Sequence, residues 1–169
     1  MHLEAGYLWK ELTKAPPDKE KNHYISAKSI RHMPKVTLNS THEFTKTFHA
    51  EDVALFAGLS QDDNPIHLDE AYAKDTVFKA RVVHGVLLLS MFSKIFGTIY
   101  PGQGGIYMSQ SAKFLRPAYI GDEITAKATL TSFEDKKKQG VFSCQAFNSR
   151  GKLLLNGEAK ILFPKAFEV

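Results

Sequence analysis

The longest apolar stretch of the chain covers residues 84–100, and its apolar side chains fall on nearly every side of a helix. They are Val86, Leu87, Leu88, Leu89, Met91, Phe92, Ile95, Phe96 and Ile99. A helix that is apolar all round is typical of the interior of a domain. At about 1.5 Å per residue it would span roughly 25 Å, which is the width of a small sheet. Pro101 and Gly102 predict where it ends.

Beyond this helix the apolar positions recur with a period of two, as in half-buried antiparallel strands. In chain order they are Ile106, Met108, Ala112 and Phe114; Ile124, Ala126, Ala128 and Leu130; Phe142, Cys144 and Ala146; and Leu153, Leu155, Ala159, Ile161 and Phe163. The connections between these segments are short. We therefore expect an α+β domain in which an antiparallel sheet wraps around a long central apolar helix, which is the hot-dog fold.

The chain divides into two regions. Residues 1–40 mix a short amphipathic piece with prolines and a polar run, and we interpret them as an N-terminal extension. Residues 41–169 form the expected hot-dog domain. It begins with an extended segment at residues 43–49 and a helix at residues 50–60, followed by a loop and a second short helical piece at residues 70–74.

Composition adds limits to this picture. The 169 residues are 43% apolar, enough for one core. The net charge of +4 comes from 22 basic and 18 acidic residues without a dense basic block, so we expect no nucleic-acid partner. The single cysteine excludes an intrachain disulfide. Without an apparent membrane span or signal-peptide core, a cytoplasmic location is expected, with the mitochondrial matrix as the alternative.

The segment QDDNPIH carries the first candidate chemistry, a carboxylate and an imidazole five residues apart at Asp62 and His67. On a continuous helix the two would face different ways, but Pro65 disfavours helical geometry at Asn64 and turns the chain. A carboxylate beside an imidazole can hold and deprotonate a water molecule. The alternative is that Asp62, Asp63 and Asn64 only make turn and capping hydrogen bonds.

The segment RVVHG carries the second candidate, because His84 and Gly85 open the long helix. Backbone amides at a helix N-terminus lack intrahelical partners and can stabilise negative charge on a carbonyl oxygen. A glycine would let a thioester approach this amide closely. The alternative for Gly85 is a small residue needed for tight packing. His84 is a weaker candidate, either as a substrate-binding group or as a direct acid or base.

These motifs together resemble the MaoC-like, (R)-specific enoyl-CoA hydratases of the hydratase 2 type. The resemblance covers residues 41–164. Its residues are Phe56, Ser60, Asp62, Asn64, Pro65, His67 and Ala73, followed by the segments VVHG, YPGQGGIYMSQSAKF and RPAYIGDEI. One departure stands directly before the first aspartate, where the family usually has glycine and this chain has Gln61.

The resemblance implies that Asp62 and His67 are catalytic, that Asn64 in the same motif binds substrate, and that the Gly85 amide binds the thioester carbonyl. It implies reversible hydration of a trans-2-enoyl thioester to a (3R)-3-hydroxyacyl thioester. The substrate would be an acyl-CoA or acyl carrier protein thioester. Neither a cofactor nor a metal is expected, because no ligand spacing or phosphate-binding loop is present.

Two other functions stay open from the sequence. A hot-dog thioesterase would bind the same thioesters but attack C1 instead of C3. A non-catalytic acyl-thioester-binding protein is the alternative outside enzymes. In each case a single hot-dog sheet leaves an uncovered edge strand, so we expect a homodimer.

Overall fold

The computed structural model describes residues 35–167, and these include all the expected strands and helices. The N-terminal extension expected over residues 1–40 lies outside the described residues except for its last six. Those six are not separate from the domain, since backbone hydrogen bonds join Asn39 and Ser40 to Leu130. The domain therefore begins before Thr41. Within the described residues, no helix has the length and apolar character needed to cross a bilayer.

In residues 35–167 the elements follow in the order of a strand, four α-helices, a π-helix and four strands, with a 3₁₀ turn between the second and third of these four strands. They are β1 (Thr41–Thr47), α2 (Ala50–Ser60), α3 (Pro65–Leu68), α4 (Glu70–Asp75), α5 (Gly85–Lys94), the π-helix η2 (Ile95–Ile99), β2 (Ile106–Phe114), β3 (Glu123–Glu134), the 3₁₀ turn η3 (Asp135–Lys137), β4 (Gln139–Asn148) and β5 (Leu153–Leu162). The expected helices at residues 50–60 and 70–74 are confirmed.

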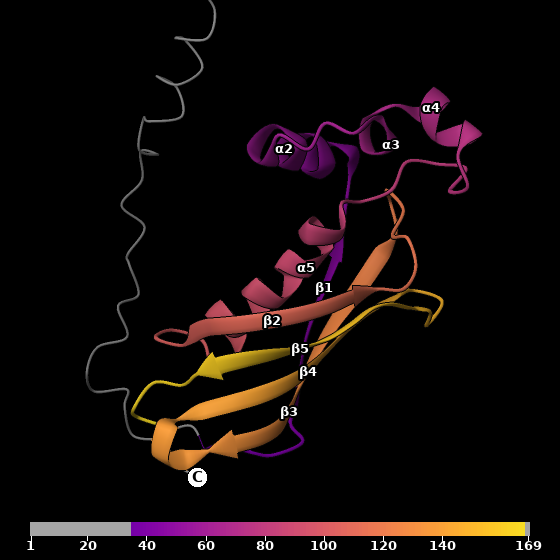
Figure 1. Cartoon of the computed structure of the whole chain (residues 1–169). Coiled ribbons are helices and arrows are strands. Elements are labelled where there is room, and N and C mark those ends of the chain that lie inside the picture. Colours follow the sequence, from indigo (N-terminus) through magenta and orange to yellow (C-terminus); the bar gives the residue numbers. More distant parts are fainter. Residues whose placement is uncertain (1–34, 168–169) are drawn as a thin grey trace, which may run out of the picture. The chain divides into compact units, whose positions relative to one another are not determined.

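The strands form one antiparallel sheet in the order β1-β3-β4-β5-β2, so β1 and β2 are its edges. Helix α5 lies along one face of this sheet (Figure 1). Beneath it, Ala126 pairs with Ala146 and Ala128 pairs with Cys144. These four side chains are fully buried, and their small size leaves room for the large residues of the helix. Burial also raises the pKa of the Cys144 thiol to about 12.

The long helix is confirmed, but it changes geometry along its length. Helix α5 continues into η2, where the Tyr100 amide donates to the Ile95 carbonyl five residues back. Its buried side chains are Leu88, Met91, Phe92, Ile95 and Phe96. Val86 and Ile99, near its two ends, are exposed by 61% and 42%. The helix is therefore buried only on the side that faces the sheet. Its composition had suggested burial on every side.

The expected alternation in β2 is wrong for half the strand. A bulge between Tyr107 and Ser109 shifts the register against β5. Tyr107 packs edge-on against Phe96 on the helix side of the sheet, whereas Ile106 and Met108 are about half exposed. The extra residue of a bulge moves the following side chains to the opposite face. A second irregularity, opposite Ala146 and Phe147, leaves consecutive Leu154 and Leu155 both buried.

Aromatic rings close the C-terminal end of the helix formed by α5 and η2. Tyr100 packs edge-on against Phe142, Phe163 and Phe167, with centroids 5.5 to 6.2 Å apart. His42 of β1 stacks flat on Tyr100 at 4.0 Å. We call these five residues the aromatic end of the domain. The opposite end of the helix, at Gly85, faces the segments that carry the candidate chemistry.

Candidate active site

The loop after α2 turns as the sequence predicts, and a set of local hydrogen bonds fixes it. Gln61 ends the helix in the left-handed conformation, with φ of 61°. The Ser60 hydroxyl oxygen then accepts a hydrogen bond from the Asp62 amide at 3.2 Å. Asn64 caps α3, its side-chain oxygen accepting from the Ile66 amide at 3.1 Å, and Pro65 occupies the first helical position. The turn and capping roles are therefore real, and they position the candidate pair rather than replace it.

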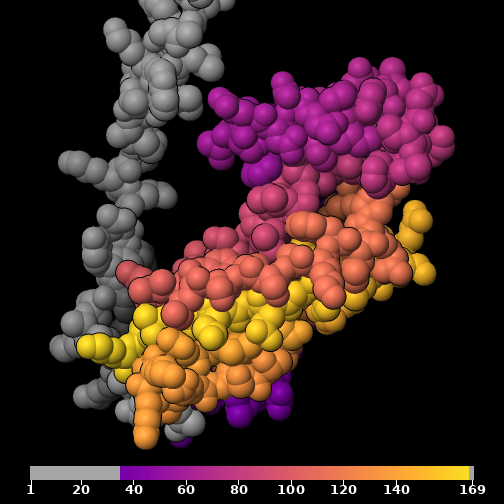
Figure 2. Space-filling view, in the orientation of Figure 1, coloured from indigo at the N-terminus to yellow at the C-terminus, as the bar shows by residue number. Residues whose placement is uncertain are grey.

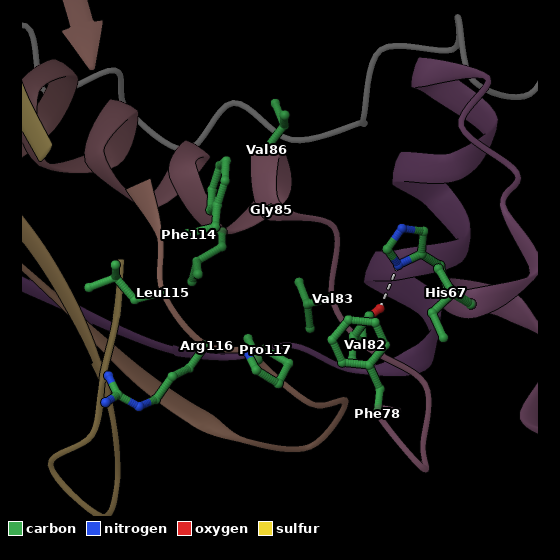
Figure 3. Close-up of a pocket in the computed structure, with 13 residues that line it drawn as sticks. His67, Phe78, Val82, Val83, Gly85, Val86, Phe114, Leu115, Arg116 and Pro117 are labelled. Carbon is green, nitrogen blue, oxygen red and sulfur yellow. Dashed lines mark hydrogen bonds between the residues drawn. The ribbon is translucent and has the colours of Figure 1, made fainter. Parts of the chain in front are cut away.

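His67 is held by one short hydrogen bond. Its Nδ1 lies 2.7 Å from the Val82 carbonyl oxygen (Figure 3). Since a carbonyl can only accept, Nδ1 carries the proton, and in the neutral ring Nε2 is left with a free lone pair. Val82 is itself fixed, because its amide donates to the Ile66 carbonyl and it forms a bridge with Tyr119. The neutral imidazole is thereby oriented as a proton acceptor.

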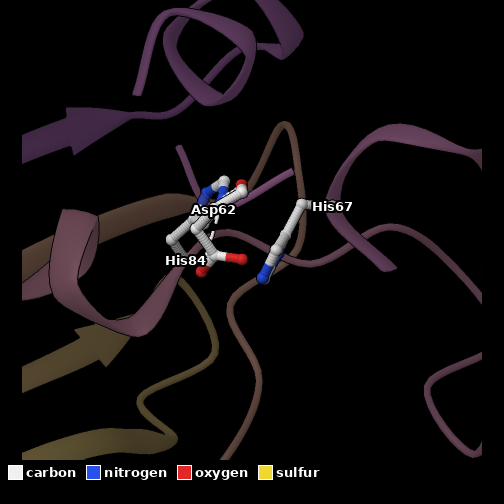
Figure 4. A group of neighbouring side chains, drawn as sticks. All are labelled: Asp62, His67 and His84. Carbon is white, nitrogen blue, oxygen red and sulfur yellow. Dashed lines mark hydrogen bonds and ion pairs between the residues drawn. The ribbon is translucent and has the colours of Figure 1, made fainter. Parts of the chain in front are cut away.

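Asp62 is the more open member of the pair. Its carboxylate is 54% exposed, and its hydrogen bond with the Asn64 amide is long, at 3.5 Å. The side chains of Asp62, His67 and His84 gather in one place (Figure 4), with a potential ligand atom of each within 4.8 Å of the others. The turn at Pro65 thus brings together the carboxylate and imidazole that the sequence placed five residues apart.

The His84 side chain is buried, with only 2% of its surface exposed. Its Nε2 lies 3.0 Å from the Asp62 carbonyl oxygen, and its ring stacks on His67 with centroids 3.7 Å apart. The ring packs against Phe56 and His67 and does not line the apolar pocket described below. Substrate binding by His84, one of the roles expected from the sequence, stays a prediction.

This group does not fit a metal ion well. His67 Nδ1 and His84 Nε2 both donate to carbonyl oxygens, so neither has a lone pair to offer. The atoms left with a lone pair are the Asp62 carboxylate oxygens, Nε2 of His67 and Nδ1 of His84, and the last of these is buried. A zinc site takes three or four protein ligands, so the two accessible groups, Asp62 and His67, are too few.

An apolar pocket of about 490 Å³ opens beside His67. Its wall is formed by the N-terminal turn of α5, the end of β2 and the loop before α5 (Figure 3); the lining includes Ile66, His67, Phe78, Val82, Val83, Gly85, Val86, Leu88, Phe114, Leu115, Arg116, Pro117 and Ala118. In the space-filling view the α2–α4 segment stands clear of most of the sheet and joins it around the start of α5 (Figure 2). His67 and Gly85 therefore border the same apolar space.

Gly85 is required by its neighbour across the pocket wall. A Cβ atom at this position would lie 3.0 to 3.1 Å from three carbons of the Phe114 ring. Gly85 is also the first residue of α5, and the first intrahelical amide is that of Leu88, so the Gly85 amide has no helical acceptor. The close packing against Phe114 is therefore confirmed, whereas binding of a thioester carbonyl by the Gly85 amide stays a prediction.

Asn64 and Phe114 lie differently from what the sequence suggested. The side-chain oxygen of Asn64 caps α3 and the residue does not line the pocket, and substrate binding by Asn64 stays a prediction. Phe114, expected in the core, is 52% exposed and forms a wall of the pocket. The signal for Phe114 was its position as the last apolar residue before the RP dipeptide, where a strand gives way to a loop.

Residues 22–146 match the family described as MaoC like domain. This chain belongs to the MaoC-like domain family. It is 40% identical to the (R)-specific enoyl-CoA hydratase of Aeromonas caviae over 140 residues, covering 83% of this chain and 100% of that protein. It is 44% identical to the (R)-specific enoyl-CoA hydratase of Rhodospirillum rubrum over 119 residues, covering 70% of this chain and 82% of that protein.

Solved structures agree with the membership of this MaoC-like domain. The (R)-hydratase from A. caviae superposes with a TM-score of 0.75 at 40% identity, covering 76% of this chain and 98% of that structure. The R-hydratase PhaJ1 from Pseudomonas aeruginosa gives a TM-score of 0.74 at 35% identity, covering 77% of this chain and 83% of that structure. The hot-dog fold and the family resemblance expected from the sequence are both confirmed.

Proposed function

We propose that this MaoC-like domain is a hydro-lyase that reversibly adds water to trans-2-enoyl thioesters, giving (3R)-3-hydroxyacyl thioesters. The observation that carries the proposal is the orientation of His67. Its Nδ1 is committed to the Val82 carbonyl, which leaves Nε2 to accept a proton beside the Asp62 carboxylate and at the wall of the apolar pocket. The 40–44% identity to proteins named (R)-specific enoyl-CoA hydratases supports it.

The reaction follows from these groups. Asp62 and His67 hold one water molecule, and the pair removes one proton as the water oxygen bonds to C3. The electrons of the double bond move onto the thioester oxygen, where the Gly85 amide stabilises the negative charge. A proton from the pair then returns to C2, which restores the carbonyl. Dehydration is the same sequence in reverse, so no redox group is needed.

The substrate carrier is proposed to be coenzyme A. Relatives are named both for CoA thioesters and for acyl carrier protein thioesters, among them a mitochondrial 3-hydroxyacyl-[acyl-carrier-protein] dehydratase of Arabidopsis thaliana at 37% identity. The preference for coenzyme A rests on the lack of a concentrated basic face in the sequence that would dock an acidic carrier protein. Three adjacent lysines, residues 136–138, lie in the turn between β3 and β4, where Lys137 pairs with Glu134 and Lys138 with Asp135. Cytoplasmic location stays a prediction.

We also propose that the protein is a homodimer. Strand β2 is an edge of the sheet, and Ile106, Met108 and Phe114 on it are 46–56% exposed. An exposed apolar edge strand is a template for pairing with another strand. A second copy would cover this edge and continue the sheet. Light scattering is expected to give twice the 18.9 kDa chain mass, and a monomer at micromolar concentration would contradict the pairing.

One assay tests the function and the carrier together. Crotonyl and longer trans-2-enoyl groups, each on coenzyme A and on acyl carrier protein, are incubated with the protein. We expect loss of enoyl absorbance without release of free thiol, and a 3R product on chiral analysis. Release of free thiol would indicate a thioesterase instead. A 3S product would contradict the stereochemistry while leaving hydration intact.

A further inference from the structure

His84 contacts or adjoins every group that the proposed reaction uses. Its Nε2 donates to the Asp62 carbonyl at 3.0 Å, its ring stacks on His67 at 3.7 Å, and the next residue is Gly85. We propose that His84 is a positioning residue that sets the spacing of Asp62, His67 and the Gly85 amide. The inference rests on the proposed function, but it assigns His84 no contact with substrate.

The hydrogen bond to Asp62 matters because the side chain of Asp62 has little else to fix it. The carboxylate is about half exposed, its own hydrogen bond to the Asn64 amide is long, and its Oδ2 lies 4.0 Å from His84 Nε2, beyond hydrogen-bond distance. The position of the carboxylate therefore depends on the main chain that carries it. His84 holds that main chain directly, at the residue that bears the carboxylate. A displaced Asp62 would lose the water geometry without losing the fold.

The stacked ring fixes the second catalytic group. The hydrogen bond at Nδ1 restricts rotation of the His67 ring. The face of the His84 ring also stacks on the face of the His67 ring, with an interplanar angle of 24°. Phe56 closes the other side of His84, with its ring edge-on at 5.0 Å. The rings of Phe56, His84 and His67 therefore pack in this order from α2 toward the pocket, and we call these three residues the stacked column.

The polarity of His84 is costly, which indicates that it is retained for a purpose. Its Nδ1 is buried and has no hydrogen-bond partner among the described residues. A buried polar atom without a partner destabilises a fold, because its desolvation is not compensated. A phenylalanine would fill a similar space without that cost. Packing alone therefore does not explain a histidine here, whereas the hydrogen bond to Asp62 does.

Two substitutions separate the two contacts. His84→Phe keeps a flat ring against His67 and removes the donor to Asp62. His84→Gln keeps a donor and removes the ring. His42→Phe is the matched control, because His42 also stacks on an aromatic ring, Tyr100, but lies at the aromatic end of the domain.

We expect kcat of His84→Phe to fall about 10- to 100-fold with KM changed less than about threefold, since misplacement by about 1 Å can cost ~10²-fold in rate. His84→Gln should recover part of kcat. The thermal midpoint of His84→Phe should stay near that of the wild type, because the lost hydrogen bond is offset by removal of the unpartnered Nδ1. His42→Phe should leave kcat unchanged. Full kcat in folded His84→Phe would overturn the inference, as would a fall in stability with no change in kcat.

Amide hydrogen exchange gives a second readout that does not depend on activity. Loss of the anchor should speed exchange of the His67 amide, which donates to the Asn64 carbonyl within the same loop, by roughly 2- to 10-fold in His84→Phe. His42→Phe should not change it. Unchanged loop exchange in His84→Phe would contradict the positioning role. A wild-type protein that hydrates no enoyl thioester would instead contradict the proposed function, and the exchange experiment would still decide the role of His84.

Discussion

The two ends of the helix formed by α5 and η2 each hold a histidine stacked on a second ring, and they use it differently. At the aromatic end, His42 lies on Tyr100 within a set of edge-to-face rings, and burial lowers the pKa of His42. At the N-terminal end, His84 lies on His67, and both rings donate to backbone carbonyls of loops. The same stacked contact serves packing at one end and orientation at the other.

This difference separates stability from activity along one helix. The aromatic end is closed by large buried side chains, whose removal leaves a cavity. The end at Gly85, which carries the proposed catalytic pair and is called the catalytic end below, is built from short loops with exposed carboxylates and single hydrogen bonds. The eight residue steps of β2 between Ile106 and Phe114 span about 27 Å at roughly 3.4 Å each, so the two ends are far apart. Substitutions at one end are expected to act independently of the other.

The largest effect is expected at the catalytic pair. Asp62→Asn keeps the shape and removes the charge, and His67→Ala removes the proton acceptor, so each should reduce kcat on the order of 10²–10⁴-fold. Because both act on the same water, the double variant should lose much less than the product of the two single losses. Steady-state kinetics on an enoyl thioester measures this, with thermal midpoints to show that the variants are folded.

Asp63→Asn is the control for this prediction. Asp63 is exposed beside Asp62, and the proposed reaction uses only the first of the two carboxylates. Its kcat should remain near that of the wild type. An inactive Asp63→Asn together with an active, folded Asp62→Asn would show that the motif is shifted by one residue.

At the aromatic end the expected effect is on stability. Phe163 contacts Tyr100, Phe133, Phe142 and Phe167, and it is 3% exposed. Phe163→Ala should lower the free energy of unfolding by about 3–5 kcal/mol, as for other buried phenylalanines. The folded fraction should keep its kcat. Denaturant titration gives the first quantity, and kinetics well below the unfolding midpoint gives the second; a large loss of kcat there would show that the ends are coupled.

The sequence predicted the helix, the strands and the convergence of Asp62 with His67, because these follow from periodicity and from the turn at Pro65. The catalytic roles of the two side chains come from the family resemblance and stay a prediction. It did not predict the switch of faces in β2, since a bulge between Tyr107 and Ser109 has no local signature in alternating apolar residues. The burial of His84 also escaped it. Whether a histidine beside a glycine faces the pocket or the core depends on Phe56 and His67, which come from other elements.

A smaller effect is expected for Gly85→Ala, which tests the wall of the pocket. The added Cβ would meet the Phe114 ring at 3.0 Å, and this ring is half exposed and can move by a few tenths of an ångström. The amide itself is retained. We expect kcat/KM to fall about tenfold, equivalent to roughly 1.4 kcal/mol of transition-state stabilisation, with little change in stability. Gly85→Ala combined with Phe114→Leu should regain part of the loss if the ring is the obstacle; no recovery would place the effect on the amide instead.

The smallest effect is expected at Gln61, the one departure from the family motif. Gln61 holds φ of 61° directly before the catalytic aspartate, a conformation that costs a residue with a Cβ about 1–2 kcal/mol and costs glycine little. Glycine gains more freedom in the unfolded chain, so Gln61→Gly should stabilise the fold by only about 0.5–1 kcal/mol.

Gly121→Ala is the reverse substitution and serves as the control. The φ of Gly121 is 89° and nothing lies within 4 Å of the added Cβ, so the change introduces backbone strain alone and should destabilise by a similar amount. Denaturation midpoints measure both changes, and kcat of Gln61→Gly should stay within about twofold because His84 still anchors the Asp62 carbonyl. If Gln61→Gly instead lost both stability and turnover, the glutamine side chain would be supporting the loop, and the catalytic end would depend on a contact outside the stacked column of Phe56, His84 and His67.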